Sequence, residues 1–367
     1  MKKGSEKDMT VENKRNYGID LLRILSMFMV VCIHVLNVGG VLWAYNTIPS
    51  KLVGNIMFTF CMCAVNTFAM ISGYVMVQSS SFKISRLINL WCQVFFYCFI
   101  GTLVFLFIQY LSGNELLSLK QIIKSIFPIL GNHYWYFTAY FVLFLLLPVI
   151  NAGLSNLTRS LYVTILFLII LLLFFIGIFG DSFGFRSGYS FVWLLICYII
   201  GGGVKLYGSL IGTKKSLLIY LIVSVLVGTY RFLSQQLGLP FGALYSSYPS
   251  PFFVINSYCL ITIFSRIEIN SNRIAKFVSF FSSGAFGVYL FHENPFFRDY
   301  IMSRRFDPLG LHGPFVLVFG TLMCACVIFF AGSLFDYIRR LIFKIFRINH
   351  VSVKIEKLIE YWSLKWM

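Results

Sequence analysis

Residues 20–42 read DLLRILSMFMVVCIHVLNVGGVL. An α-helix rises 1.5 Å per residue, so about 20 consecutive apolar residues are enough to cross the hydrocarbon core of a membrane. This run is long enough and predicts a first transmembrane helix. Asp20 and Arg23 interrupt its start, and no small-residue cleavage site is evident. The helix is therefore expected to be retained rather than removed as a signal peptide.

Nine further apolar runs follow along the chain. Hydrophobic residues make up 59% of the 367 residues and charged residues only 12%, whereas a soluble protein usually has about 25% charged residues. This composition excludes a soluble enzyme, a disordered protein and a secreted disulfide scaffold. The sequence predicts an all-α, polytopic integral membrane protein with about ten transmembrane helices. The other nine are expected near 52–78, 88–111, 133–150, 160–179, 188–207, 216–234, 252–268, 278–298 and 314–338.

Lysine and arginine residues are unevenly divided between the two sets of loops. With ten spans, 21 of them fall on the side of the termini and 8 on the other side, with Arg23 inside the first span. Because cytoplasmic loops are rich in Lys and Arg, both termini are expected in the cytoplasm. This asymmetry and anionic lipid account for the net charge of +17 without nucleic acid. The predicted organisation is an N-terminal segment 1–19, a membrane domain 20–338 and a basic amphipathic tail 339–367.

All nine cysteines lie in apolar stretches, which is typical of buried free thiols. The members of the pairs Cys61/Cys63 and Cys324/Cys326 are two residues apart, so they point to different sides of a helix and do not match zinc-ligand spacing. No disulfide and no metal site are predicted. The triplet at 201–203, GGG, ends a span without a following GK[ST], so it favours close helix packing over a phosphate loop.

Three ionisable side chains lie in the first span, where a charge is costly. Arg23 and His34 are 11 residues apart, which is about three helical turns, so they share one face at a separation of about 16 Å along the axis. A pair between Asp20 and Arg23 would by itself account for these two charges. His34 lies deeper, where an imidazole needs both a donor and an acceptor. Neighbouring carbonyls would meet this need if His34 were only structural.

The ninth span contains a second polar group in the segment GVYLFHENP at 287–295. By the predicted topology, His292 lies at a depth similar to that of His34, with Glu293 beside it and Pro295 loosening the helix. Two histidines and a carboxylate in one membrane layer are typical of a site that handles protons. The alternative is that His292 and Glu293 only mark the outer end of the span.

An aromatic cluster, HYWYF at 133–137, opens the fourth span on the outer side. Trp135 and Tyr136 fit the aromatic belt found at membrane interfaces. Together with His133, the same rings would also suit contact with a sugar.

Five segments, in order along almost the whole chain, resemble motifs of the membrane acyltransferase-3 family. Arg23 and His34 are similar to its R-x10-H signature. Lys83 and Arg86 match the basic residues that, in the family, follow the motif to which residues 68–74 are similar. The other matching segments are FAMISGY at 68–74, YWYF at 134–137 with LPVIN at 147–151, and GVYLFH at 287–292. The departures are small, since Ala69 replaces a Phe of the family pattern and Ser85 replaces an Arg.

The resemblance implies an enzyme that transfers an acyl group, commonly acetyl, from cytoplasmic acyl-CoA to a hydroxyl group. The acceptor would be an extracytoplasmic surface polysaccharide or a lipid-linked sugar, and the site would be the plasma membrane of a bacterium. His34 would act as general base or be transiently acylated, and His292 and Glu293 would orient it or complete a proton path. The expected binding residues are Arg23, Lys83 and Arg86 for the phosphates of acetyl-CoA, Ser72, Asn66 and Asn256 for the thioester oxygen, and His133, Trp135 and Tyr136 for the acceptor.

Two other classes of membrane protein match part of this pattern. A proton-coupled transporter or flippase would also use histidines, a carboxylate and a proline-broken helix. Such a carrier has no evident use for the stripe from Arg23 to His34, which suits a long acyl donor. A membrane-embedded binding or sensing protein is expected to carry a soluble signalling domain, of which the sequence gives no sign. The acyltransferase is therefore the favoured interpretation.

Overall fold

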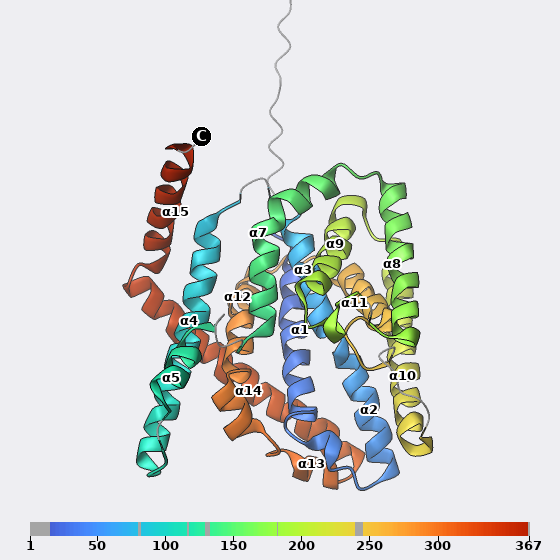
Figure 1. Cartoon of the computed structure of the whole chain (residues 1–367). Coiled ribbons are helices and arrows are strands. Elements are labelled where there is room, and N and C mark those ends of the chain that lie inside the picture. Colours follow the sequence, from blue (N-terminus) through green and yellow to red (C-terminus); the bar gives the residue numbers. More distant parts are fainter. Residues whose placement is uncertain are drawn as a thin grey trace, which may run out of the picture.

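The computed structural model describes residues 15–79, 82–115, 117–128, 133–181, 183–238 and 245–365 (Figure 1). Every regular element in these ranges is a helix, which confirms the all-α prediction. Most of the predicted N-terminal segment lies outside the described residues. The helices are α1 (Tyr17–Leu36), η1 (Val41–Trp43), α2 (Ile48–Met62), α3 (Ala64–Met76), α4 (Ile84–Leu111), α5 (Leu119–Ile126), α7 (Trp135–Ser155), α8 (Arg159–Phe179), η2 (Arg186–Gly188), α9 (Phe191–Tyr207), α10 (Thr213–Leu237), α11 (Pro251–Phe264), α12 (Asn272–His292), η4 (Phe297–Met302), α13 (Asp307–Leu311), α14 (Pro314–Ile345) and α15 (Ile348–Lys365).

Eight stretches within the described residues are long and apolar enough to cross a membrane. One of them, Ile48–Met76, joins α2 and α3 end to end. The shorter apolar helices α9 and α11 coincide with the sixth and eighth predicted spans. Each predicted run therefore has a helical counterpart, and the number of crossings and the side of the termini stay predictions. Side chains such as Phe167 and Phe179 of α8 are exposed, as expected of a surface that faces lipid.

Helix α1 lies at the centre of the bundle, where α2, α3, α11, α12 and α14 pack around it (Figure 1). It begins at the end of the bundle that also carries α15, which we call the α15 end, and it finishes at the opposite end, beside α13, which we call the α13 end. Arg23 therefore lies toward the α15 end and His34 toward the α13 end. Because α1 is mostly buried, its polar side chains face protein rather than lipid.

Helices α3 and α9 pack closely along much of their length, and glycines make their contact possible. A Cβ atom on Gly73 would overlap the carbonyl oxygen of Tyr198, and one on Gly201 would overlap the carbonyl of Met70. Small residues let helix backbones approach this closely. The close-packing interpretation of the glycine triplet is thus confirmed.

Two predicted boundaries differ from the structure. Helix α12 ends at His292 rather than near residue 298, with Glu293 as its C-cap. Pro295 follows, and a proline disfavours helical backbone at the residue before it. Helix α14 continues to Ile345, so the predicted tail 339–367 is not one element. Arg339 and Arg340 lie three and four residues after Asp336 and pair with it, and such pairs stabilise a continuing helix.

Candidate active site

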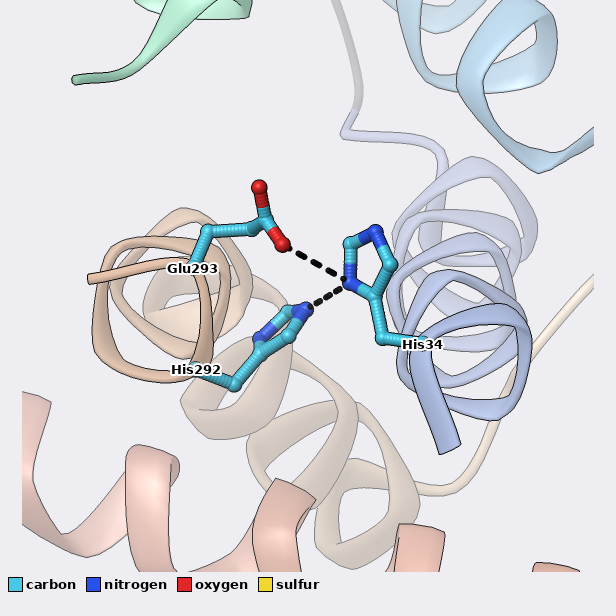
Figure 2. A group of neighbouring side chains, drawn as sticks. All are labelled: His34, His292 and Glu293. Atoms are coloured by element: carbon cyan, nitrogen blue, oxygen red, sulfur yellow. Dashed lines mark hydrogen bonds and ion pairs between the residues drawn. The ribbon is translucent and has the colours of Figure 1, made fainter. Parts of the chain in front are cut away.

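His34, His292 and Glu293 come together where α1 and α12 end, and Figure 2 shows the three side chains facing one another. Nε2 of His292 lies 2.8 Å from Nδ1 of His34. The same Nδ1 atom lies 3.3 Å from Oε1 of Glu293. His292 is fully buried although it is the last residue of α12. His292 and Glu293 therefore mark the end of the helix and also belong to an enclosed polar cluster. The two interpretations of this segment, an end of the span and a site that handles protons, are compatible.

The hydrogen bonds define which nitrogen atoms carry protons. Nδ1 of His292 lies 2.6 Å from the carbonyl oxygen of Val288, which can only accept, so this nitrogen carries the proton of a neutral ring. Nε2 of His292 is then an acceptor, and Nδ1 of His34 donates a hydrogen bond to it. The remaining nitrogen of His34, Nε2, is left with a lone pair. It points away from both partners in Figure 2 and has no hydrogen-bond partner among the described residues.

Glu293 places a carboxylate beside the proton that His34 carries on Nδ1. Its other oxygen, Oε2, lies 3.7 Å from a guanidinium nitrogen of Arg298. Arg298 also forms an ion pair with Asp299 at 2.8 Å and is about one-third exposed. Glu293 is therefore positioned between a histidine and a cation. If His34 gains a proton at Nε2, the carboxylate can stabilise the resulting imidazolium.

A cavity of about 430 Å³ adjoins His34, which exposes 17% of its side chain. Its volume is in the range of sites for small organic ligands. Arg298 and Glu293 contribute charged groups to its wall. Aromatic rings cover much of the remainder, as is common where sugar rings bind, and these rings belong to Trp135, Tyr136, Tyr189, Tyr248, Phe286 and Tyr289.

Arg23 is held at the opposite end of α1 by a compact network. Its Nη1 atom donates to Oδ1 of Asp20 at 2.9 Å and to the hydroxyl of Ser282 at 3.0 Å. Arg15 also pairs with Asp20, and the hydroxyl of Ser282 donates a hydrogen bond to Oδ1 of Asp20. The predicted pairing of Asp20 with Arg23 is therefore present. It links the start of α1 to α12, and a quarter of the Arg23 side chain stays exposed.

Lys83 and Arg86 lie at the first turn of α4, near the α15 end. Lys83 is the N-cap residue, and both side chains are exposed. Neither forms an ion pair within the described residues. Arg86 lines two cavities, which makes it accessible to a ligand from this end.

Four of the predicted substrate residues are not among those that line the cavity beside His34. The amide of Asn66 donates to the carbonyl of Tyr248 and accepts from the indole of Trp193, so its hydrogen bonds are used within the protein. The amide of Asn256 donates to Ser224. Ser72 donates to the carbonyl of its own helix four residues earlier, and His133 contacts the carbonyl of Lys124. The cavity beside His34 therefore does not include these four residues.

Several residues of the site were missed by sequence reasoning. Arg298 is the last residue of the predicted ninth span and had no assigned role, and Tyr189 and Tyr248 lie in loops that only folding brings to Trp135. Asp336 did give a usable signal, since a carboxylate inside an apolar run needs a partner. Fully buried, it pairs with Arg339 and Arg340.

His34, His292 and Glu293 also form a group whose potential metal-ligand atoms all lie within 4.8 Å of one another. A metal ion bound to Nδ1 of His34 would have to replace the proton that this atom donates to His292. The hydrogen-bonded chain already satisfies the same atoms. The absence of a metal stays a prediction.

One family model matches the chain, and its description is "Acyltransferase domain", the domain of the acyltransferase-3 family. The match covers residues 16–334, which is most of the 367 residues and includes the three residues of Figure 2. No curated protein and no solved structure matches the chain. The family match favours acyl transfer over a carrier without chemistry.

Proposed function

The protein belongs to the acyltransferase-3 family of membrane acyltransferases, and we propose that it transfers an acyl group, acetyl in the simplest case, from acyl-CoA to a hydroxyl of a surface glycan or lipid-linked sugar. The donor enters from the cytoplasm at the α15 end. The acceptor enters from outside at the α13 end. The membrane is the plasma membrane of a bacterium, and no metal takes part.

The observation that carries the proposal is the unprotonated Nε2 atom of His34, which has no hydrogen-bond partner among the described residues. Its ring lines the aromatic cavity, and its other nitrogen is committed to His292 and Glu293. A neutral imidazole held in one tautomer with an accessible lone pair can accept a proton at neutral pH. A proton-coupled transporter would not require an unprotonated imidazole nitrogen beside an aromatic cavity that is large enough for a sugar ring.

The reaction follows from this tautomer. Nε2 of His34 takes the proton of the acceptor hydroxyl while the hydroxyl oxygen bonds to the thioester carbonyl carbon. The carbon–sulfur bond then breaks, and the imidazolium returns its proton to the departing thiolate of CoA. Glu293 stabilises the imidazolium through its contact with Nδ1. The alternative course is attack by Nε2 itself on the thioester carbonyl carbon, which breaks the carbon–sulfur bond, releases the CoA thiolate and forms an acyl-histidine. The acceptor hydroxyl then attacks the acyl carbon, the carbon–nitrogen bond breaks, and the hydroxyl proton passes to the thiolate.

The two substrates approach His34 from opposite ends of α1. Arg23, Lys83 and Arg86 supply positive charge for the donor phosphates, since guanidinium and ammonium groups form charge-assisted hydrogen bonds with phosphate. The axial separation of about 16 Å between Arg23 and His34 suits the long pantetheine arm of acyl-CoA. The sugar ring of the acceptor stacks on Trp135 and Tyr136 in the cavity.

The test is acyl transfer by the purified protein in nanodiscs. Acetyl-CoA labelled in the acetyl group is supplied with and without surface glycan, and CoA release and labelled products are followed. His34→Ala is compared with wild type and with His350→Ala, a matched control in which an exposed histidine of α15 is removed.

We expect CoA release by wild type and by His350→Ala, and its loss in His34→Ala. Label that stays on wild-type protein without acceptor, and is absent from His34→Ala, would identify the acyl-histidine route. Residual turnover of His34→Ala above roughly one hundredth of wild type contradicts a central acid–base role. Wild-type protein that neither binds nor turns over acetyl-CoA contradicts the proposed donor.

A further inference from the structure

A second charged cavity lies at the α15 end, between the first turns of α4 and the end of α14. Its volume is about 540 Å³. The wall contains four cationic side chains and three amides, which are Arg86, Arg339, Arg340, Lys344, Asn89, Gln93 and Asn349. This cavity is separate from the aromatic cavity beside His34, with which it shares no lining residue.

The positive charge of this basic cavity is only partly balanced. Asp336 lies against the cavity wall, and it pairs with Arg339 at 2.8 Å and with Arg340 at 3.2 Å. Arg86 and Lys344 have no ion pair within the described residues. Four cations against one carboxylate leave an excess of three positive charges. Such a concentration of like charge is unfavourable unless an anion neutralises it.

Arg340 shows that hydrogen-bonding capacity is also left over. Its Nη1 atom donates to the hydroxyl of Ser283 at 2.6 Å, and Nε faces Asp336. Its Nη2 atom is buried and has no hydrogen-bond partner among the described residues. A buried donor without a partner costs free energy, which an anionic ligand would recover. Planar guanidinium groups are suited to phosphate in particular.

The cavity chemistry matches a nucleotide with several phosphates. Three excess charges suit three phosphate groups. Asn89 and Asp336 occupy one end of the Asn349 and Gln93 amides, and the remaining ends, Nδ2 of Asn349 and Oε1 of Gln93, can pair with the edge of an adenine ring. The nucleotide half of CoA is an adenosine with a phosphate on the ribose and a diphosphate that leads to pantetheine. Building on the proposed function, we propose that the basic cavity binds this half of acyl-CoA, which adds Arg340 and Lys344 of α14 to the donor site.

The position of the cavity agrees with the route to His34. Arg86 also lines a smaller cavity of about 70 Å³ between α3, α4 and α7, whose walls include Met76, Phe82 and Phe144. Arg340 contacts Ser283, and Arg23 contacts the adjacent Ser282, so both guanidinium groups lie at one level of α12. From there to His292 the helix rises about 14 Å over nine residues, a span suited to an extended arm.

The test measures binding without chemistry. Adenosine 3′,5′-bisphosphate, which has no thioester, is titrated against the full-length protein in phosphatidylcholine nanodiscs by calorimetry. The variant is R86Q/K344Q, because both side chains are exposed and without ion pairs, so the fold is spared. Lys120→Gln, an exposed lysine of α5, and His34→Ala are the controls.

We expect the dissociation constant to rise at least about tenfold in the double variant, as loss of charge-assisted hydrogen bonds implies. Lys120→Gln and His34→Ala should stay within about twofold of wild type. Unchanged binding in the double variant overturns the inference. A second outcome also overturns it: wild type does not bind the nucleotide, and phosphatidylglycerol raises the melting temperature of wild type but not of the variant. Lipid phosphate is then the occupant of the cavity.

A second measurement separates this inference from the proposed function. If wild type transfers acetyl groups and the double variant keeps the same KM for acetyl-CoA, the basic cavity is not the nucleotide site although the function holds. If the bisphosphate binds and the variant loses it, but no acyl transfer occurs, the cavity assignment stands as a nucleotide site and the proposed function fails.

Discussion

Nε2 of His292 lies 2.8 Å from Nδ1 of His34, across a contact between residues 258 positions apart in the chain. The carbonyl of Val288 holds the proton on the far side of His292, so a backbone group determines the tautomer of a histidine on another helix. The chemistry of His34 thus depends on the last turn of α12, where hydrogen-bond geometry is set by the packing of α1 against α12.

The first prediction concerns His292→Phe, which keeps a ring but removes the acceptor. Nδ1 of His34 then loses its acceptor at 2.8 Å, and only the longer 3.3 Å contact with Glu293 still favours the tautomer with an unprotonated Nε2. We expect kcat to fall by about 10²–10³ with unchanged affinity for acetyl-CoA. Nitrogen NMR of labelled histidine should show Nδ1-protonated His34 in wild type and a mixture of tautomers in the variant. A mixture with unchanged kcat would contradict the positioning role of His292.

The second prediction concerns Glu293→Gln, which keeps the size of the side chain and removes its charge. Because the carboxylate faces the proton on Nδ1 of His34, its loss raises the energy of the imidazolium formed during transfer. We expect kcat to fall about 10- to 100-fold, with little change in KM. Asp299→Asn is the matched control, since Asp299 is an exposed carboxylate that also pairs with Arg298. Equal losses in both variants would indicate a general charge effect instead.

The sequence predicted the parts of the site that are unusual in a membrane. Arg23, His34 and His292 stand out because polar groups in apolar runs require a reason, and helical spacing places the first two on one face. The common depth of His34 and His292 followed from the predicted topology, and the two rings do meet. Periodicity alone sufficed here because each residue lies on a long regular helix.

Hydrogen-bond partners could not be predicted in the same way. Asn66 and Asn256 are polar residues in apolar runs, just as His34 is, yet their side chains are bonded to Trp193 and Ser224 inside the bundle. Which face of α3 meets α9 depends on close backbone packing between helices, and hydropathy does not encode it. The end of α12 was also misjudged, because the sequence alone did not show that the backbone leaves the helix before Pro295.

The third prediction tests the close contact between α12 and α14. A Cβ atom on Gly287 would overlap the carboxylate of Asp336, which is fully buried and also accepts from Tyr97 at 3.1 Å. Gly287→Ala should destabilise the protein by about 1–3 kcal/mol and lower its melting temperature. Gly153→Ala is the control, because nothing lies within 4 Å of its added methyl group and alanine is the better helix former. A Gly287→Ala protein as stable as Gly153→Ala would mean that the two helices can move apart freely.

The fourth prediction concerns pH and the docking of α15 on α4. Oε1 of Glu356 accepts from the backbone N–H of Ser85 at 3.3 Å, in the first turn of α4. Burial raises the pKa of this carboxyl, but hydrogen bonds from Ser85 and Ile84 and the charge of Lys83 outweigh it, so the pKa lies below its ordinary value. A depressed pKa in the folded state means that the carboxylate stabilises the fold at pH values above its unfolded pKa of about 4.3. The contribution is lost as pH falls through the lower, folded pKa.

Glu356→Gln should therefore be less stable than wild type by about 1 kcal/mol at pH 7, which is typical for the loss of a group that caps a helix N-terminus. The difference should shrink in acid and disappear once the wild-type carboxyl is protonated. Thermal unfolding of both proteins from pH 7 down to pH values below about 4 measures it. Glu360→Gln, one turn further along α15 and exposed, should match wild type throughout. A difference that grows in acid would mean that the folded-state pKa of Glu356 is raised, and the carboxylate would then not anchor α15 to α4.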